Sequence, residues 1–322
     1  MSSYTFDTVW PADTVEFVPG HDDLLVVGTY LLREATENSP MSRVGELILL
    51  RIADERLNVL QGFELGAVLD IKWRNDVAAA ATADGTIAQF SYSVDKLSRT
   101  SDVQTASGPG VLCLALDWSC DGTRVAVSHS DGSVALLNPL TSTVAETWHA
   151  CDFETWAIGC DMFDPHVLYS GGDDCMWKIW DTRADARIPS FTSRRRDAGI
   201  TTLTANPHTP HLLAVGSYDA TVQTYDTRFP RTPLHTVEVG GGVWRVRWHP
   251  SPARSDDALV ACMHDGFKVV QFGTENDAVV RRFDEHTSLA YGAAWGQAGG
   301  NDGETIIASC SFYDHLLKIW KA

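Results

Sequence analysis

The stretch SYDATVQTY (217–225) is one of six similar turns that recur along the chain. In each copy an aspartate separates an upstream apolar run from a downstream segment in which apolar and polar residues alternate, as in a half-buried strand. The other five copies are TADGTIAQF (82–90), HSDGSVALL (129–137), GDDCMWKIW (172–180), MHDGFKVVQ (263–271) and FYDHLLKIW (312–320). Successive aspartates lie 43 to 49 residues apart. This spacing predicts one structural unit repeated along the chain.

Each period has room for four short strands. GVWRVRWHP (242–250) alternates apolar and polar residues, and ALVACMH (258–264) is a nearly continuous apolar run, as expected for a strand covered on both faces. FKVVQF (267–272) and AVVRRF (278–283) follow the turn. A period near ~45 residues with Trp-Asp endings is typical of WD40 blades. The same order begins near Pro11, so we predict an all-β, seven-bladed WD40 β-propeller.

The seventh blade lacks a fourth strand, because only Lys321 and Ala322 follow HLLKIW (315–320). An open strand edge is a liability for a folded protein. The segment YTFDTV (4–9) is an alternating strand with no blade of its own. We therefore expect residues 4–9 to pair with 315–320 and close the ring, so that residues 1–322 form a single domain. The turn aspartates are expected to be structural, since aspartate accepts backbone N–H groups in tight turns.

Composition narrows the classes of function. The formal charge of −17 argues against nucleic-acid binding, and it suits either a basic partner or a solvated acidic surface. No apolar run is long enough to span a membrane, so no membrane association is expected. The seven cysteines form no CxxC pair and lie mostly in or beside apolar strands, which indicates buried thiols and a cytoplasmic location. No Cys/His set has zinc spacing, and neither a metal nor a cofactor is predicted.

One residue stands just before each of the seven turns, where WD propellers point a side chain onto the top face around the mouth of the central channel. These residues are Tyr30, Ala83, Ser130, Asp173, Tyr218, His264 and Tyr313. The first strands add Trp156, Trp244 and Tyr291 to the same rim, and Glu154 lies two residues before Trp156. Aromatic rings with nearby acids suit a quaternary or methylated ammonium group. The alternative is that some of these rings pack against neighbouring blades.

Few catalytic motifs are present. The chain has no GxSxG nucleophile elbow and no HExxH. His264 is the only histidine in the ring of residues before the turns, which makes it the best acid–base candidate. Cys262 and Ser217 are candidate nucleophiles, although we expect their side chains to face into the blade.

Several runs of the sequence resemble a specific family. They include LLAVGSYD (212–219), GGVWRVRWHP (241–250), ACMHDGFK (261–268) and ASCSFYDHLLKIW (308–320), of which the last two are the most specific. These runs are similar to the diphthine methyl ester hydrolases, the WD-repeat methylesterases of the diphthamide pathway. The resemblance covers nearly the whole chain.

The resemblance implies a reaction. The substrate would be translation elongation factor 2 carrying a modified histidine with a trimethylammonium group and a methyl ester, and hydrolysis would give diphthine and methanol. No residue-level mechanism comes with the resemblance, so the roles are hypotheses drawn from the top face. His264 would be the general base, and Tyr218 or Tyr313 would donate to the developing oxyanion. The cation would be held by Trp156, Trp244, Tyr291, Tyr30, Asp173 and Glu154.

Two other readings stay open. WDTR (180–183) and YDTR (225–228) resemble the motif of WD substrate receptors for cullin-type ubiquitin ligases, which would make the protein a non-enzymatic adaptor. The arginines of these motifs also have a local explanation, which is packing against the adjacent aspartates. A reader of methylated lysine would use the same aromatic cage. The sequence leaves both a covalent acyl-enzyme and direct attack by water open.

Overall fold

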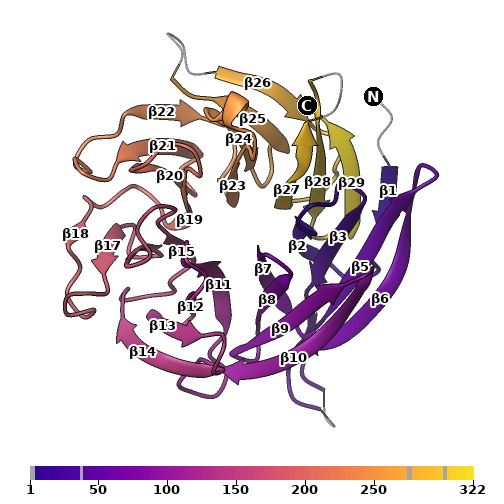
Figure 1. Cartoon of the computed structure of the whole chain (residues 1–322), viewed down its shortest axis with the longest axis horizontal. Coiled ribbons are helices and arrows are strands. Elements are labelled where there is room, and N and C mark those ends of the chain that lie inside the picture. The colour runs from indigo at the N-terminus through magenta and orange to yellow at the C-terminus, as the bar shows by residue number, and fades with distance from the viewer. Residues whose placement is uncertain (1–3, 37–38, 274–277, 300–302) are drawn as a thin grey trace.

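The structure is a computed structural model that describes residues 4–36, 39–273, 278–299 and 303–322. These residues form seven antiparallel sheets arranged in a ring around a central axis, as Figure 1 shows. The all-β, seven-bladed propeller expected from the repeated turns is therefore confirmed. The helical structure in the described residues is one 3₁₀ turn, η1 (Pro252–Arg254).

The strands of the first four blades follow one another in chain order. Blade 1 consists of β2 (Ala12–Phe17), β3 (Leu24–Thr29), β5 (Ser42–Ala53) and β6 (Arg56–Gly66), with the short β4 (Leu31–Arg33) also paired to β5. Blade 2 consists of β7 (Val68–Arg74), β8 (Val77–Thr82), β9 (Thr86–Ser93) and β10 (Lys96–Gln104). Blade 3 consists of β11 (Cys113–Trp118), β12 (Val125–His129), β13 (Ser133–Asn138) and β14 (Thr143–His149). Blade 4 consists of β15 (Ala157–Cys160), β16 (Val167–Gly171), β17 (Trp177–Asp181) and β18 (Phe191–Thr192).

The remaining blades repeat this layout. Blade 5 consists of β19 (Ile200–Ala205), β20 (Leu212–Ser217), β21 (Thr221–Asp226) and β22 (His235–Glu238). Blade 6 consists of β23 (Arg245–Trp248), β24 (Asp257–Ala261), β25 (Phe267–Gln271) and β26 (Ala278–Phe283). Blade 7 takes β27 (Ala290–Gly299), β28 (Thr305–Ser311) and β29 (Leu316–Lys321) from the end of the chain and β1 (Tyr4–Asp7) from its beginning.

The N-terminal strand closes the ring as the sequence predicts. β1 runs antiparallel to β29, with Tyr4 opposite Ile319. The backbone N–H of Thr8 continues the pairing by donating to the carbonyl of His315 at 2.9 Å. Tyr4 and Phe6 pack on the apolar cluster between blades 7 and 1. Both chain ends therefore lie in one sheet, and β1 supplies the fourth strand that covers the edge of β29.

Apolar side chains and tryptophans join each blade to the next. Three tryptophans of first strands donate an indole N–H to a backbone carbonyl of the preceding blade. They are Trp118 to Lys72 at 3.2 Å, Trp248 to Thr204 at 3.0 Å and Trp295 to Arg247 at 2.9 Å. These contacts join the first strands of three pairs of neighbouring blades, which line the central channel.

The turn aspartates take structural positions, as expected. Asp219 accepts from the backbone N–H of Thr221 at 3.0 Å, and Asp131 accepts from that of Ser133 at 3.0 Å. Asp265 instead pairs with Lys268 and with Arg282, the latter at 2.9 Å. Each carboxylate holds the turn between the second and third strands of its blade, on the top face.

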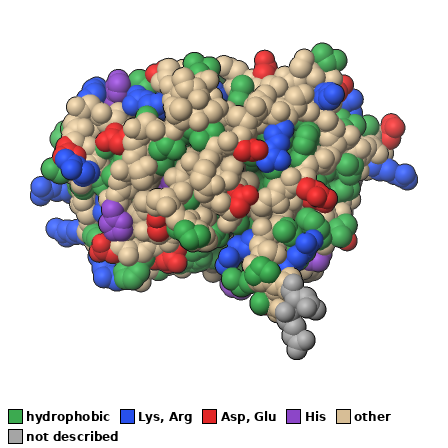
Figure 2. All heavy atoms as spheres, turned by 90° about the horizontal axis from the view of Figure 1, so that it is seen from below, with side chains coloured by type: hydrophobic (Ala, Val, Ile, Leu, Met, Phe, Trp, Pro, Cys, Tyr) green, Lys and Arg blue, Asp and Glu red, His purple; other side chains and the backbone are tan. Residues whose placement is uncertain are grey.

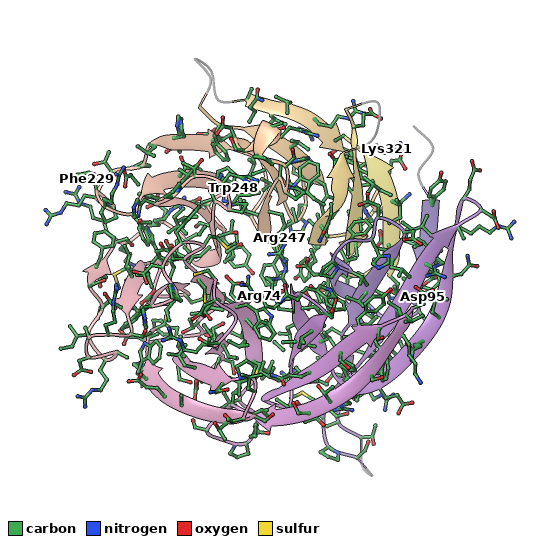
Figure 3. The ribbon with its side chains drawn as sticks, viewed as in Figure 1. Arg74, Asp95, Phe229, Arg247, Trp248 and Lys321 are labelled. Carbon is green, nitrogen blue, oxygen red and sulfur yellow. The ribbon has the colours of Figure 1, made fainter. Side chains whose placement is uncertain are left out.

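The outside of the disc carries charges of both signs. Figure 2 views the disc edge-on, where acidic and basic side chains are interspersed. In Figure 3 Phe229, Asp95 and Lys321 lie at the periphery, whereas Arg247 points into the centre. Among the described residues, no helix has the length and apolar character that crossing a membrane requires.

Candidate active site

Each blade presents one equivalent residue, at or just before the start of its first strand, to the mouth of the channel. In blade 4 the N–H of Asp173 donates to the carbonyl of Glu154, and in blade 1 the N–H of Tyr30 donates to the carbonyl of Pro11. In each blade the equivalent residue lies two positions after the residue that supplies this carbonyl, which gives Trp156 in blade 4 and Asp13 in blade 1. The same bond in blades 2, 3 and 5 gives Leu69, Leu114 and Thr201. Trp244 and Tyr291 stand at the matching place in blades 6 and 7. Together with Asp13 and Trp156, we call these seven residues the collar.

The pairing of the strands explains how collar residues leave the blade. In five blades the register between the first and second strands shifts at this residue, which marks a β-bulge. A bulged residue is unpaired and can point away from the ladder. The collar is thus built by the backbone, and the sequence decides only which side chain each blade contributes.

An aromatic cavity of about 440 Å³ opens on the top face above the collar. Its rings are Tyr30, Trp156, Trp244, Tyr291, Phe312 and Tyr313. Leucines complete the walls, and Asp13 contributes the one ionisable acid among its lining residues. This volume lies within the range of about 300–1,000 Å³ that is usual for small-molecule sites.

The rings form a continuous chain of contacts. Trp244 stacks on Tyr291 with centroids 4.6 Å apart, and its other neighbour, Trp156, lies at 5.7 Å. Tyr291 contacts Phe312 at 4.9 Å, and Phe312 contacts Tyr30 at 5.8 Å. Contact between rings holds each ring in place, so the cavity presents fixed aromatic surfaces.

The structure brings together five of the aromatic residues singled out from the sequence. Tyr30, Trp156, Trp244, Tyr291 and Tyr313 all line the aromatic cavity. The sixth, Tyr218, lies outside it and touches its wall, with its ring 6.1 Å from that of Trp244. Burial, together with the nearby Asp173, raises the pKa of Tyr218 to about 12.

The three polar residues expected beside these rings lie elsewhere. Asp173 and Glu154 are half-buried and do not line the aromatic cavity. The Asp173 carboxylate lies instead close to Gly199 of blade 5. His264 is exposed and lines a second cavity of about 460 Å³, which shares Tyr313 with the aromatic cavity.

The two candidate nucleophiles are inside the blades, as expected. Cys262 and Ser217 are fully buried. Burial raises the pKa of the Cys262 thiol to about 12, which keeps it protonated at neutral pH. The Ser217 hydroxyl donates to the carbonyl of Ala198 at 3.2 Å. Neither side chain is available to a ligand on the top face.

Sequence reasoning missed the ring of Phe312 and the one carboxyl of the aromatic cavity, that of Asp13. Asp13 is 4% exposed, and its Oδ1 has no hydrogen-bond partner among the described residues. Burial raises the pKa of this carboxyl, Arg245 and the Trp244 indole oppose the shift, and Asp70 adds to it, so that the pKa is raised to about 7. An unpaired carboxyl of this kind in a cavity is a mark of functional sites. Pro11 pairs with Tyr30 in the same way as Glu154 pairs with Asp173, so Asp13 holds in blade 1 the position that Trp156 holds in blade 4. Aligning these two blades could have identified Asp13 from the sequence.

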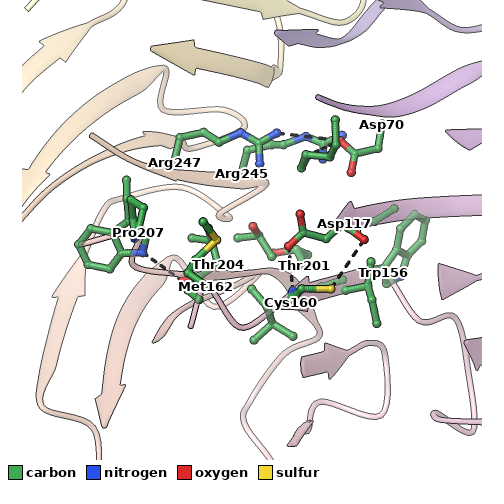
Figure 4. A pocket seen from close by; sticks show the side chains of 18 of the residues that line it. Asp70, Asp117, Trp156, Cys160, Met162, Thr201, Thr204, Pro207, Arg245 and Arg247 are labelled. Carbon is green, nitrogen blue, oxygen red and sulfur yellow. Dashed lines mark hydrogen bonds and ion pairs between the residues drawn. The ribbon is translucent and has the colours of Figure 1, made fainter. Parts of the chain in front are cut away.

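A network of charges fills the channel below the collar. Asp70 pairs with Arg245 at 2.8 Å and with Lys72 at 2.9 Å, and Arg247 pairs with Glu16 at 2.7 Å. Figure 4 shows Arg245 reaching Asp70 across the cavity of about 240 Å³ at this level. Burial opposes ionisation of Asp70, but Arg245, Lys72 and Arg247 outweigh it and lower its pKa to about 2.

The arginines of the two adaptor-like motifs have local partners. Arg183 forms two hydrogen bonds of 2.8 Å with Asp181, and Arg228 pairs with Asp226 at 2.7 Å. Within the described part of the chain, no group of three or more His, Cys, Asp or Glu side chains is arranged to hold a metal ion.

Comparison with known proteins agrees with this architecture. The family model of the WD domain, G-beta repeat, matches residues 100–137. The chain is 30% identical to the diphthine methyltransferase homolog of Dictyostelium discoideum over 97% of this chain and 96% of that protein. It belongs to the diphthine methyltransferase family. The human family member, named diphthine methyltransferase, is 34% identical, over 90% of this chain and 74% of its own length.

The family's fold also matches solved propellers. A chain in the crystal structure of the mitotic checkpoint complex superimposes with a TM-score of 0.77 over 99% of this chain and 90% of that chain. The two sequences are 15% identical, so this likeness concerns the fold alone.

Proposed function

We propose that this protein hydrolyses the methyl ester of methyl-esterified diphthine on translation elongation factor 2, giving diphthine and methanol in diphthamide biosynthesis. Membership of the diphthine methyltransferase family supports the pathway. The observation that carries the reaction is the aromatic cavity, with six rings and the buried Asp13 carboxyl. Because the elongation factor works in the cytoplasm, we propose the same location for this protein.

The substrate's trimethylammonium group explains the rings. A quaternary ammonium has no N–H to donate, so it binds through its charge and its methyl surface. Each well-placed ring face contributes about 0.5–2 kcal/mol to such a cation. Trp156, Trp244 and Tyr291 form adjacent walls that such a group can contact together.

The direction of the reaction is our inference. The relatives' name denotes methyl transfer, whereas we propose that a methyl is removed. An amine that awaits methylation carries N–H groups, which need acceptors when they are buried. Rings and leucines supply few acceptors, so the aromatic cavity favours a side chain that is already fully methylated. The runs ACMHDGFK (261–268) and ASCSFYDHLLKIW (308–320) resemble the methylesterases.

Tyr313 is the better placed of the two proposed oxyanion donors. It stands at the boundary of the two cavities, whereas Tyr218 reaches the aromatic cavity only through Trp244. A phenolic hydroxyl aimed at the ester oxygen stabilises the charge that develops in the transition state.

Mass spectrometry of methyl-esterified elongation factor 2, with and without the purified protein, tests the proposal. We expect loss of the mass of one methylene, which is the change from methyl ester to acid. Trp244→Ala should slow this loss, while Phe229→Ala, which removes an exposed ring at the periphery, should not. An ester that survives prolonged incubation with the protein would contradict the proposal. If the protein then captured a ubiquitin-ligase adaptor in a pull-down, the adaptor function would replace it.

A further inference from the structure

We propose that Asp13 is the general base of this ester hydrolysis and acts on a water held at the collar. The inference rests on the proposed function and adds a catalytic residue to it. Among the seven collar residues, Asp13 is the only acid. It lines both the aromatic cavity and a small cavity directly below, so its carboxyl lies between the place for the substrate and the channel.

The small cavity has the size and polarity of a water site. Its volume is about 20 Å³, and one water needs roughly 10–15 Å³ measured in the same way. Four of the residues that line it, Asp13, Trp156, Trp244 and Arg245, each have a buried nitrogen or oxygen atom with no hydrogen-bond partner. A buried water makes two to four hydrogen bonds, which these groups can supply.

The charges around Asp13 keep it usable as a base. Arg245 on β23 and Asp70 on β7 act on it with opposite signs, and Arg245 is engaged by Asp70 at 2.8 Å. Tyr291 on β27 and Cys310 on β28 face it as neutral groups, because burial raises the pKa of both. Among the described residues, Asp13 Oδ1 has no hydrogen-bond partner, in contrast to the arginine-paired carboxylate of Asp70.

The chemical step balances with water and ester alone. Asp13 Oδ1 takes a proton from the water as the water oxygen bonds to the ester carbonyl carbon. The tetrahedral intermediate then breaks its bond to the methoxy oxygen, and Asp13 returns the proton to that oxygen, which leaves as methanol. The new carboxylic acid loses its proton to solvent. A trimethylammonium held by the rings favours ionised Asp13, so substrate binding itself promotes the basic form.

His264 is less suitably placed for this task. It is exposed and belongs to the second cavity, with Tyr313 at the boundary between that cavity and the substrate rings. Asp13 is under the rings themselves. In the substrate the ester and the trimethylammonium are on the same carbon atom, so the base must lie close to the cation cage.

The test is hydrolysis of methyl-esterified elongation factor 2 by wild type and Asp13→Asn between pH 5.5 and 8.5. For wild type we expect kcat/KM to rise through about pH 7 and then level off. Asp13→Asn should lower kcat by about 100-fold or more and abolish this rise. Its affinity for the diphthine-bearing product, measured by calorimetry, should fall by less than about tenfold. A thermal melt at each pH checks that the variant is folded.

Each other outcome has a definite meaning. Wild type that leaves the ester intact contradicts the proposed function as a whole. An active wild type with a fully active Asp13→Asn contradicts only the role of Asp13, as does a variant that loses affinity while it keeps kcat. If Asp13→Asn does not fold, the pH profile of wild type still tests the role of Asp13. A kcat/KM that does not change from pH 6 to 8 excludes a general base with a pKa of about 7. If the rise of kcat/KM with pH is lost in His264→Ala and kept in Asp13→Asn, the general base is His264.

Isotope labelling separates a base from a nucleophile. After many turnovers in H₂¹⁸O, we expect the label in the product carboxylate and none in the peptide that contains Asp13. Label in Asp13 would show direct attack by its carboxylate through an anhydride and would overturn the role of general base.

Discussion

Asp13 and Asp70 are two buried carboxyls on the first strands of neighbouring blades, and their surroundings make them opposites. Asp70 is surrounded by Arg245, Lys72 and Arg247, and its pKa is about 2. Asp13 has an oxygen without a hydrogen-bond partner among the described residues, and burial raises its pKa to about 7. Asp13 is at the collar, while Asp70 lies one residue below the collar position of its blade. A difference of one position in the first strand therefore decides the role of the carboxyl. At the collar it can exchange a proton at neutral pH, and one residue below the collar it is held ionised by ion pairs.

The largest expected effect comes from removing the charge of the paired carboxyl. Asp70→Asn leaves Arg245 and Lys72 buried without their shared partner. Breaking a buried ion pair from one side costs about 3–5 kcal/mol. We expect the free energy of unfolding in urea to fall by this amount. An unchanged urea midpoint would mean that the network contributes nothing to the fold.

Asp13→Asn should raise the free energy of unfolding, whereas Asp70→Asn lowers it, and this gain should be seen only at high pH. Because the pKa of Asp13 is raised from 3.8 in the unfolded chain to about 7, the folded protein binds this proton more tightly. The associated stability is present below pH 4 and is lost as pH rises to about 7, on the order of 4 kcal/mol in all. Asp13→Asn should therefore melt higher than wild type at pH 8 and much like it at pH 4. Equal melting differences at both values would contradict a raised pKa.

Arg245 acts on both carboxyls, so replacing it should change the titration of each. Arg245 lowers the pKa of both Asp13 and Asp70. In Arg245→Met we expect the rise of kcat/KM with pH to move up by about one unit, along with some loss of stability. Arg245→Lys retains the positive charge and is the matched control, with a smaller displacement. A profile that stays in place in both variants would show that the titrating group is not near Arg245.

The smallest effect concerns the ring beside Asp13. Trp244→Ala removes one wall of the aromatic cavity and should raise KM by roughly 2- to 30-fold, which corresponds to about 0.5–2 kcal/mol for one ring. Trp244→Phe retains an aromatic face and should recover most of the affinity, while the loss of the indole N–H moves the pH profile slightly upward. Steady-state kinetics across pH separates the two changes. A KM for Trp244→Ala equal to that of wild type would remove this ring from the cation site.

The fold and most of the rings could be predicted because they follow from periodicity. The recurrent turn defines the blades, and the position before each turn places Tyr30 and Tyr313 on the top face. Trp244 and Tyr291 could be added because they stand at the entry to the first strands of blades 6 and 7. These are local properties of the sequence, and the propeller repeats them with little change from blade to blade.

Asp13 could not be singled out, because its distinction is the absence of a partner. In sequence it is one polar residue in an alternating strand, and blade 1 lacks the turn aspartate that aligns the other six blades. Whether a buried acid is paired depends on side chains from other blades, such as Arg245. The position of Asp173 has the same explanation: its carboxylate lies near Gly199 and Tyr218 of the next blade and does not line the aromatic cavity.

The most direct test of the account is a titration of both carboxyls by carbon-13 NMR, with assignments from Asp13→Asn and Asp70→Asn. Asp13 should titrate near pH 7 and move to lower pH when tetramethylammonium is added, since a cation in the aromatic cavity favours its ionised form. Asp70 should stay ionised down to at least pH 4, and its titration should not change when tetramethylammonium is added. An Asp13 that titrates near pH 4 and does not respond to tetramethylammonium would contradict the central claim, which is that this unpaired carboxyl under the rings is the reactive one.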